Sequence, residues 1–133
     1  MKIPTWLPTY GRIDYRGACP REALEQVTFF RRLRDAYPDT LGRIALHPRN
    51  EGKRTHSQTD REKAEGMALG ASDVIIPAKV PFVCEIKRQD HTKSTWQPGQ
   101  IEYLEAAHNE GAFVCVALGV DAAWEALNDW RSQ

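Results

Sequence analysis

The sequence predicts one α/β domain in which a small mixed β-sheet is flanked by helices. Segments with helical periodicity alternate with short apolar segments, in the order helix, strand, short helix, strand, strand, helix, strand, helix. The chain has 133 residues, which is enough for one hydrophobic core at roughly 100–200 residues per domain. No repeat, low-complexity tract or linker divides the sequence, so we expect at most one active site per chain.

The composition excludes several classes of protein. The chain carries 18 Lys and Arg against 18 Asp and Glu, and this balance excludes a histone-like binder or an acidic disordered solubiliser. A local basic face is still compatible with zero net charge. The sequence lacks both an apolar run near the roughly 20 residues of a membrane span and the apolar segment of a signal peptide. Cys19, Cys84 and Cys115 fit neither a disulfide framework nor a metal knuckle, so we expect reduced thiols in a cytoplasmic protein.

The first part of the chain predicts a leader, a helix and a strand. Residues 1–19 contain two glycines and scattered aromatic residues without an apolar period, so we expect an irregular leader that packs on the core or contributes to a dimer. Pro20 suits the first turn of a helix, and apolar residues of 21–37 follow a 3.6-residue period. The apolar segment 43–47 is bounded by glycine and proline, which predicts a strand.

The rest of the chain predicts a hairpin, a central strand and three helices from turn residues, caps and apolar runs. In order, we expect a loop at 50–57, a helix at 61–67 capped by Thr59 or Asp60, hairpin strands at 73–77 and 81–87, a helix from Pro98 to Gly111, a buried strand at 112–119, and a last helix capped by Asp121.

Charged side chains lie at neighbouring ends of the two hairpin strands. Glu85 and Lys87 project from one face of their strand because side chains alternate. In a hairpin Asp73 and Glu85 converge, which offers oxygen ligands to a hard cation such as Mg²⁺. A lysine beside such a cation can hold an attacking water or neutralise a phosphorane-like transition state. The same residues are also compatible with an ordinary solvated surface, since Glu-x-Lys is common by chance.

An ordered set of motifs resembles a known family. The motifs are Glu22-x3-Gln26, Gly66-Met-x2-Gly70-x2-Asp73, Glu85-Ile-Lys87-Arg88, and Gln100-x3-Leu104 followed by Gly111 before an apolar strand. From about Pro20 to Trp130 the chain resembles the VRR-NUC (virus-type replication-repair nuclease) family of the PD-(D/E)xK restriction-endonuclease-like superfamily. The resemblance implies a restriction-endonuclease-like core, in the order αβββαβ, within residues 20–133. Ser72 departs from the family's usual proline, and the loop between Lys87 and Gln100 is longer than usual.

The resemblance also implies roles for individual residues. Asp73 and Glu85 match the family's metal-binding carboxylates, Lys87 its catalytic lysine, and Gln100 the glutamine that supports the site. The Ile86 carbonyl would be a further ligand of Mg²⁺ or Mn²⁺.

Two acids, Glu22 and Glu25, compete for the metal-binding position on the first helix. We favour Glu22, which shares a helix face with Gln26, whereas Glu25 points about 60° further around the helix. Either acid could instead complement the helix macrodipole, and that alone is a sufficient role for Glu25.

Basic residues cluster at three places where they could contact a phosphate backbone. The clusters are Arg31, Arg32 and Arg34 on the first helix, Arg49, Lys53 and Arg54 on the following loop, and Arg88 with Lys93 after the catalytic strand. A solvated basic face explains them equally well. We predict DNA contacts first for Lys53 and Arg54, then for Arg88 and Lys93. His47 and His56 fit no zinc spacing, so we interpret them as structural or surface residues.

The expected function is that of a Mg²⁺- or Mn²⁺-dependent endonuclease that hydrolyses phosphodiester bonds in DNA. Small members of the family are phage-like and act as dimers on branched DNA, which implies a homodimer, a DNA junction such as a four-way (Holliday) junction, and a role in DNA repair in a bacterial or phage-infected cell. One site per chain agrees with a dimer, because symmetrical cutting of two strands needs two sites. A non-catalytic nucleic-acid-binding module of the same fold, or an enzyme acting on RNA or nucleotides, stays open as an alternative.

Overall fold

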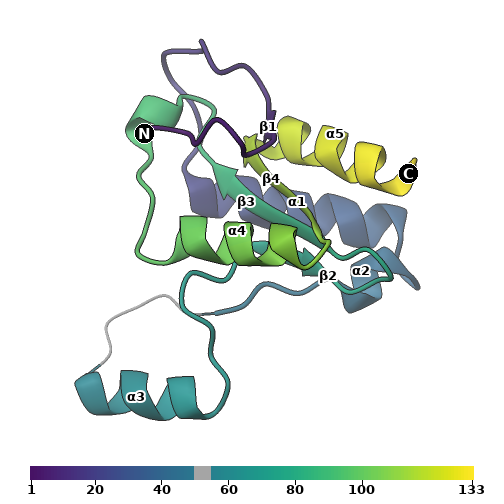
Figure 1. Ribbon diagram of the computed structural model, residues 1–133. Helices are drawn as coiled ribbons and strands as arrows, with labels where there is room; N and C mark the ends of the chain where they lie inside the picture. The colour runs from purple at the N-terminus through teal and green to yellow at the C-terminus, as the bar shows by residue number, and fades with distance from the viewer. Residues whose placement is uncertain (50–54) are drawn as a thin grey trace.

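A four-stranded mixed sheet forms the centre of the computed structural model, which describes residues 1–49 and 55–133 (Figure 1). Its strands are β1 (Thr9–Tyr10), β2 (Val74–Ile76), β3 (Phe82–Lys87) and β4 (Phe113–Leu118), in the order β1-β4-β3-β2. β3 and β4 are parallel, β2 is antiparallel to β3, and β1 is parallel to β4. The predicted hairpin and the predicted central strand are therefore confirmed.

Helices cover both faces of the sheet (Figure 1). α1 (Glu22–Ala36) and α5 (Val120–Arg131) pack on one face, and α4 (Gln100–Asn109) packs on the other. Alternation along β3 separates the two layers, because Cys84 and Ile86 face α1 and α5 whereas Val83 faces Leu104 of α4. β3 and β4 are buried on both faces, which explains the continuous apolar run of β4.

The leader is attached to the sheet and is more regular than expected. β1 pairs with β4, and the Val116 N–H donates a hydrogen bond to the Pro8 carbonyl. Leu7 is buried in the core layer beneath α4, and the indole N–H of Trp96 donates to the Lys2 carbonyl. The leader therefore packs on the core, which is one of the two roles that its sequence left open.

The strand predicted at 43–47 is wrong. Leu41–Ile44 forms the short helix α2, and Leu46 alone pairs with Ile75 in an isolated bridge. Gly42 explains the difference, because a Cβ atom there would lie 2.6 Å from the Tyr37 carbonyl and 2.8 Å from the Arg34 Cα. The glycine lets the chain fold back against the end of α1 instead of extending along the sheet.

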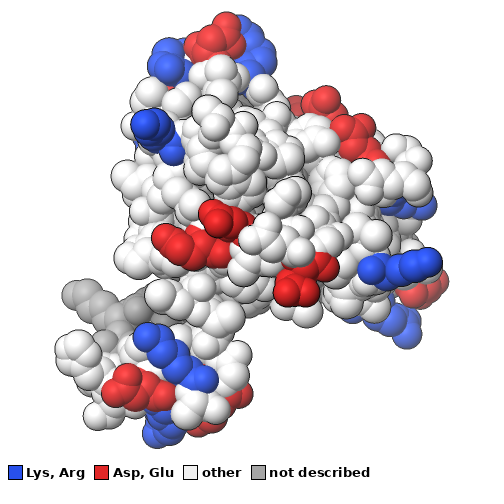
Figure 2. All heavy atoms as spheres, viewed as in Figure 1, with Lys and Arg blue, Asp and Glu red and all other residues white. Residues whose placement is uncertain are grey.

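The short helix α3 (His56–Ala64) begins earlier than expected. Thr55 caps it in a capping box, in which the Thr55 hydroxyl accepts from the Gln58 N–H and the Gln58 side chain accepts from the Thr55 N–H. Thr59 therefore lies inside the helix and does not cap it. α3 buries no residue and projects from the body (Figure 1), and it carries basic and acidic side chains together (Figure 2).

The last helical element before α4 is the one-turn helix η1 (His91–Lys93), capped by Asp90. Within the described part of the chain, every helix is too short or too polar to cross a membrane.

Candidate active site

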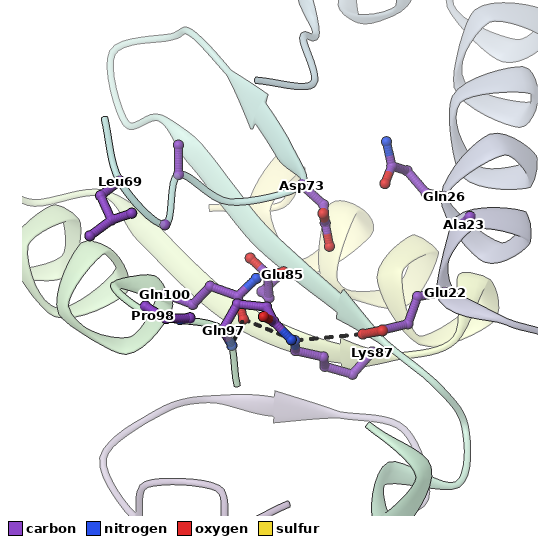
Figure 3. Close-up of a pocket in the computed structure, with 12 residues that line it drawn as sticks. Glu22, Ala23, Gln26, Leu69, Asp73, Glu85, Lys87, Gln97, Pro98 and Gln100 are labelled. Atoms are coloured by element: carbon purple, nitrogen blue, oxygen red, sulfur yellow. Dashed lines mark hydrogen bonds and ion pairs between the residues drawn. The ribbon is translucent and has the colours of Figure 1, made fainter. Parts of the chain in front are cut away.

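A pocket of about 570 Å³ lies where the first turns of α1 and α4 meet the polar ends of β2 and β3 (Figure 3). Its polar lining consists of Glu22 and Gln26 from α1, Asp73 before β2, Glu85 and Lys87 from β3, and Gln97 and Gln100 at α4. Asp73 lies at the start of β2 and Lys87 at the end of β3, so the antiparallel pairing brings both to one edge. The structure thus collects Glu22, Asp73, Glu85, Lys87 and Gln100 in one pocket, and their catalytic roles stay predictions.

Lys87 forms the buried base of the pocket, with only 2% of the residue exposed. Its Nζ donates to the Thr95 carbonyl at 2.8 Å and to Gln100 Oε1 at 2.9 Å, and it lies 3.5 Å from Glu22 Oε1. The Trp96 ring covers it, with Nζ 5.1 Å from the ring centroid. A buried ammonium group needs such partners, and together they fix its position.

Gln100 connects Lys87 to Glu85 through its side-chain amide. Its Nε2 donates to Glu85 Oε1 at 2.9 Å, while its Oε1 accepts from Lys87 Nζ and from the Gln97 N–H. An amide is suited to this position because its nitrogen only donates and its oxygen only accepts, so it can serve an ammonium and a carboxylate at once. Gln100 therefore holds the Glu85 carboxylate and the Lys87 ammonium at a fixed separation.

Close contact between Gly70 and Gly99 positions the start of α4 beside Asp73. Gly70 has φ +73°, and a Cβ atom on it would lie 2.1 Å from the Gly99 carbonyl carbon. A side chain at either position would push α4, and Gln100 with it, away from the pocket. Gly70 of the motif is therefore needed for the close approach of the two main chains.

The three carboxylates of the pocket could carry more negative charge than Lys87 balances. Burial, with the nearby charge of Asp73, raises the pKa of Glu85 well above its ordinary value, and burial also raises the pKa of Glu22 although Lys87 opposes this. Glu85 is 1% exposed, and its Oε2 has no hydrogen-bond partner in the described part of the chain. Three carboxylates thus share the one lysine in the lining.

This donor set fits a hard divalent cation, which prefers carboxylate and carbonyl oxygens. Glu85 Oε2, which has no partner among the described residues, is one such oxygen. The Ile86 carbonyl is another. The Ile86 N–H donates to Asp73 Oδ2 at 2.9 Å, and the N–H and C=O of one strand residue point the same way, so this carbonyl also points toward Asp73. Within residues 1–49 and 55–133, no three His, Cys, Asp or Glu side chains already surround one metal position. Asp73, Glu85 and the Ile86 carbonyl would hold such an ion, and Glu22, which pairs with Lys87, lines the same pocket.

The two acids in the first turn of α1 have different partners. Glu22 lines the pocket and pairs with Lys87. Glu25 is buried, and its Oε2 accepts a hydrogen bond of 2.7 Å from the Val120 N–H at the start of α5. Gly119 permits this approach, because a Cβ atom there would lie 2.5 Å from Glu25 Oε2. Glu25 therefore satisfies the N-terminus of α5, and the structure places Glu22 alone of the two at the pocket.

Asp121 was expected to cap the last helix, and this prediction is wrong. The N-cap is Gly119, and Asp121 lies in the first turn of α5. Its carboxylate is exposed and lies 3.5 Å from a guanidinium nitrogen of Arg32. The capping acid comes from α1 instead, a contact between residues distant in the sequence.

The basic residues predicted to bind DNA lie in two situations. Lys53 and Arg54 fall outside the described residues. Arg88 donates from Nε to the Pro20 carbonyl and from its terminal nitrogen to the Cys19 carbonyl, and Lys93 Nζ donates to the Gly17 carbonyl. Both side chains thus hold the end of the leader, and a DNA contact by either stays a prediction.

Sequence reasoning missed the partners of Lys87 in the loop before α4. Thr95 contributes its main-chain carbonyl, which any residue could supply, so no sequence signal identifies it. Trp96 carried a signal, since an aromatic residue in a polar loop often covers a neighbouring group. His47 is structural as expected, with Nδ1 2.8 Å from the Asp73 carbonyl, and His56 begins α3 at the surface.

The fold can be compared with known proteins. No family model matches the sequence, and no curated protein matches it. Among solved structures, a chain described as "VRR_NUC domain protein" is similar, with a TM-score of 0.66 and 20% sequence identity over 89% of this chain and 92% of that one. At this identity the similarity concerns the fold. The sheet and its flanking helices therefore form the α/β, restriction-endonuclease-like fold of a VRR-NUC domain.

Proposed function

We propose that this protein is a divalent-metal-dependent DNA endonuclease that hydrolyses phosphodiester bonds. The observation that carries this proposal is the group of three carboxylates around buried Lys87, in which Glu85 Oε2 has no hydrogen-bond partner in the described part of the chain. The shared fold of a VRR_NUC domain protein supports it, since that protein is named for a nuclease domain.

The residues of the pocket would divide the work between holding the metal and orienting the reactants. Glu22, Asp73, Glu85 and the Ile86 carbonyl would hold Mg²⁺ or Mn²⁺. Such an ion, when bound, lowers the pKa of a water molecule and offsets negative charge on a phosphate.

Lys87 is suited to position the attacking water and to stabilise negative charge on the reacting phosphate. Its ammonium is held by Thr95 and Gln100, so its charge is already oriented before substrate binds. Gln100 would act as a positioning residue, because it contacts both Glu85 and Lys87. The chain would thus supply orientation and charge stabilisation.

We further propose that two copies of the chain act together on branched DNA such as a four-way junction. Each chain contributes one carboxylate cluster, and a symmetrical pair of cuts in two strands needs two clusters related by a twofold axis. Sedimentation of the protein alone and with a junction tests this part separately from cleavage.

Cleavage assays test the nuclease. Labelled four-way junction, flap, single-stranded and duplex DNA are incubated with Mg²⁺, Mn²⁺ or EDTA and with the wild type, Asp73→Asn or Lys87→Ala. Glu25→Gln serves as the matched control, because it removes an acid from the same region but outside the pocket. We expect metal-dependent cleavage by the wild type and the control, and none by the other two.

A different result would favour the binding module. Folded wild-type protein that cuts none of these DNAs, yet binds one tightly and keeps that affinity in both pocket variants, would overturn the enzyme.

A further inference from the structure

A second groove, of about 730 Å³, adjoins the active-site pocket. Gln26 of α1 lines both hollows. From there the groove follows α1 past Val27 to Arg31 and Arg34, with residues 45–47 as its opposite wall. His47 connects that wall to the pocket, since its Nδ1 lies 2.8 Å from the Asp73 carbonyl.

The two arginines of this groove carry free hydrogen-bonding groups. Within the described residues, neither Arg31 nor Arg34 has a carboxylate within ion-pair distance or a hydrogen-bond acceptor. The Arg34 guanidinium carbon lies 5.3 Å from the centroid of the Phe30 ring, which supports the group from one side. Asp35 also lines the groove, so two guanidinium groups face one carboxylate and positive charge predominates.

Arg32, between them in sequence, is used differently. Its guanidinium carbon lies 4.2 Å from the centroid of a Trp124 ring, and a guanidinium nitrogen lies 3.5 Å from Asp121 Oδ1. Arg32 therefore joins α1 to α5, whereas Arg31 and Arg34 line an open groove with no carboxylate or hydrogen-bond partner among the described residues.

We propose that this groove binds the sugar-phosphate backbone of the strand that is cut, with Arg31 and Arg34 on phosphates a few nucleotides from the scissile bond. This inference rests on the proposed nuclease function and adds the path of the substrate. Guanidinium groups suit phosphate because their planar donors can bind two oxygens together. The apolar Val27 and Leu46 in the walls suit the sugars between the phosphates.

Distance along α1 agrees with this path. A helix rises about 1.5 Å per residue, so Arg31 and Arg34 start about 14 to 18 Å along the axis from Glu22. A backbone with one phosphate per nucleotide reaches them within a few nucleotides of the pocket. The face over α4 is less suitable, because it exposes the acids Glu102 and Glu105, and acidic side chains gather there in Figure 2.

The test compares the double variant Arg31→Ala/Arg34→Ala with Arg32→Ala. Cleavage is measured with these substitutions in the otherwise wild-type chain. Binding is measured with the same substitutions added to Asp73→Asn, which is expected to bind DNA without cutting it. Affinity for duplex and junction DNA is measured over a range of salt concentrations, after thermal melting has shown that each variant is folded. We expect the double variant to lose about 10- to 100-fold in affinity and the slope of log K against log salt to fall by about two. Arg32→Ala is expected to keep the salt slope.

Single neutral methylphosphonate linkages then locate the contacts. Placed in turn on each side of the cut, they should weaken wild-type binding at positions a few nucleotides away, on one side. The same linkages should not weaken binding by the double variant any further, because that variant lacks the guanidinium groups that would contact those phosphates.

The outcomes separate the two proposals. A wild type that cuts DNA, with a double variant that matches Arg32→Ala in affinity and salt slope, overturns the groove and leaves the nuclease intact. A wild type that neither cuts nor binds any DNA overturns the nuclease and the groove with it. Binding without cutting, with the expected loss in the double variant, supports the groove and removes the catalytic function alone.

Discussion

Two carboxylates differ in how far their hydrogen-bonding capacity is used. One is Asp90, in the cluster after β3 that holds the leader, and the other is Glu85, in the pocket. In the cluster that holds the leader, Asp90 accepts from the Gly17 N–H at 3.0 Å, the Thr92 N–H at 3.1 Å and the Thr92 hydroxyl at 2.6 Å. The hydrogen bonds from Thr92 and Gly17 lower the pKa of Asp90 to about 2. In the pocket, Glu85 keeps one oxygen without a partner in the described residues, and burial raises its pKa.

The difference separates charge that maintains structure from charge available to a ligand. A carboxylate with all its partners gains little from a cation, whereas a buried carboxylate with a free oxygen gains a large part of its missing solvation. We therefore expect substitution of Asp90 to lower stability without affecting cleavage. Substitution of Glu85 in the pocket should abolish cleavage without lowering stability.

The largest effect is expected for Glu85→Gln. Glutamine preserves the acceptor for Gln100 but removes one of the mutually repelling charges. Cleavage should fall about 1000-fold or more, while the free energy of unfolding without metal rises by about 1 to 2 kcal/mol. Initial rates in Mg²⁺ and urea denaturation in EDTA measure the two effects. A variant less stable than the wild type in EDTA would contradict the comparison.

Gln100→Ala should have the next largest effect, about 10- to 100-fold on cleavage. The substitution leaves Lys87 and Glu85 in place but removes the amide that fixes them together. Gln97→Ala is the matched control, because Gln97 contributes its main-chain N–H to this network and alanine retains that group. Equal rates for the two variants would show that the amide does not orient the pocket.

Glu25→Ala extends the comparison to α1, where an acid that holds the start of α5 stands one turn from an acid that lines the pocket. We expect a loss of about 2 kcal/mol in the free energy of unfolding, since the partly buried Val120 N–H loses its acceptor. Cleavage measured well below the melting temperature should be unchanged. Glu22→Ala should show the reverse pattern, and loss of cleavage by both variants at full stability would argue against their separation.

The smallest effect is expected in the pH dependence of stability, measured as the melting temperature in EDTA. Asp90 and Glu85 should contribute to this dependence with opposite sign. Asp90 has a lowered pKa, so its stabilisation is present above 3.8 and is lost as the pH falls toward 2. Glu85 has a raised pKa, so its contribution is present below 4.5 and is lost as the pH rises through its folded value. Asp90→Asn should flatten the first dependence alone, and Glu85→Gln the second alone.

Local sequence patterns were sufficient to predict elements that form whichever residues pack against them. The hairpin of β2 and β3 and the buried strand β4 followed from apolar runs and turn residues, because a strand of this length needs only a sheet on which to pack. The segment 43–47 is also short and mainly apolar but folds differently, because Gly42 allows close contact with the end of α1. No local pattern contains that contact. Thr55 and Thr59 both suit a cap, and the capping box with Gln58 favours Thr55.

The sequence alone determined that Glu85 and Lys87 project from one face of a strand and that Asp73 lies at the neighbouring end, since alternation and pairing are local rules. Only the tertiary structure decided between Glu22 and Glu25, because both stand in one helical turn and their surroundings come from residues far along the chain. It likewise assigned Arg88 and Lys93 to carbonyls of the leader, and placed Arg31 and Arg34 beside the pocket with no hydrogen-bond acceptor among the described residues. Such contacts depend on which surfaces meet in the folded chain, and residue spacing does not encode this.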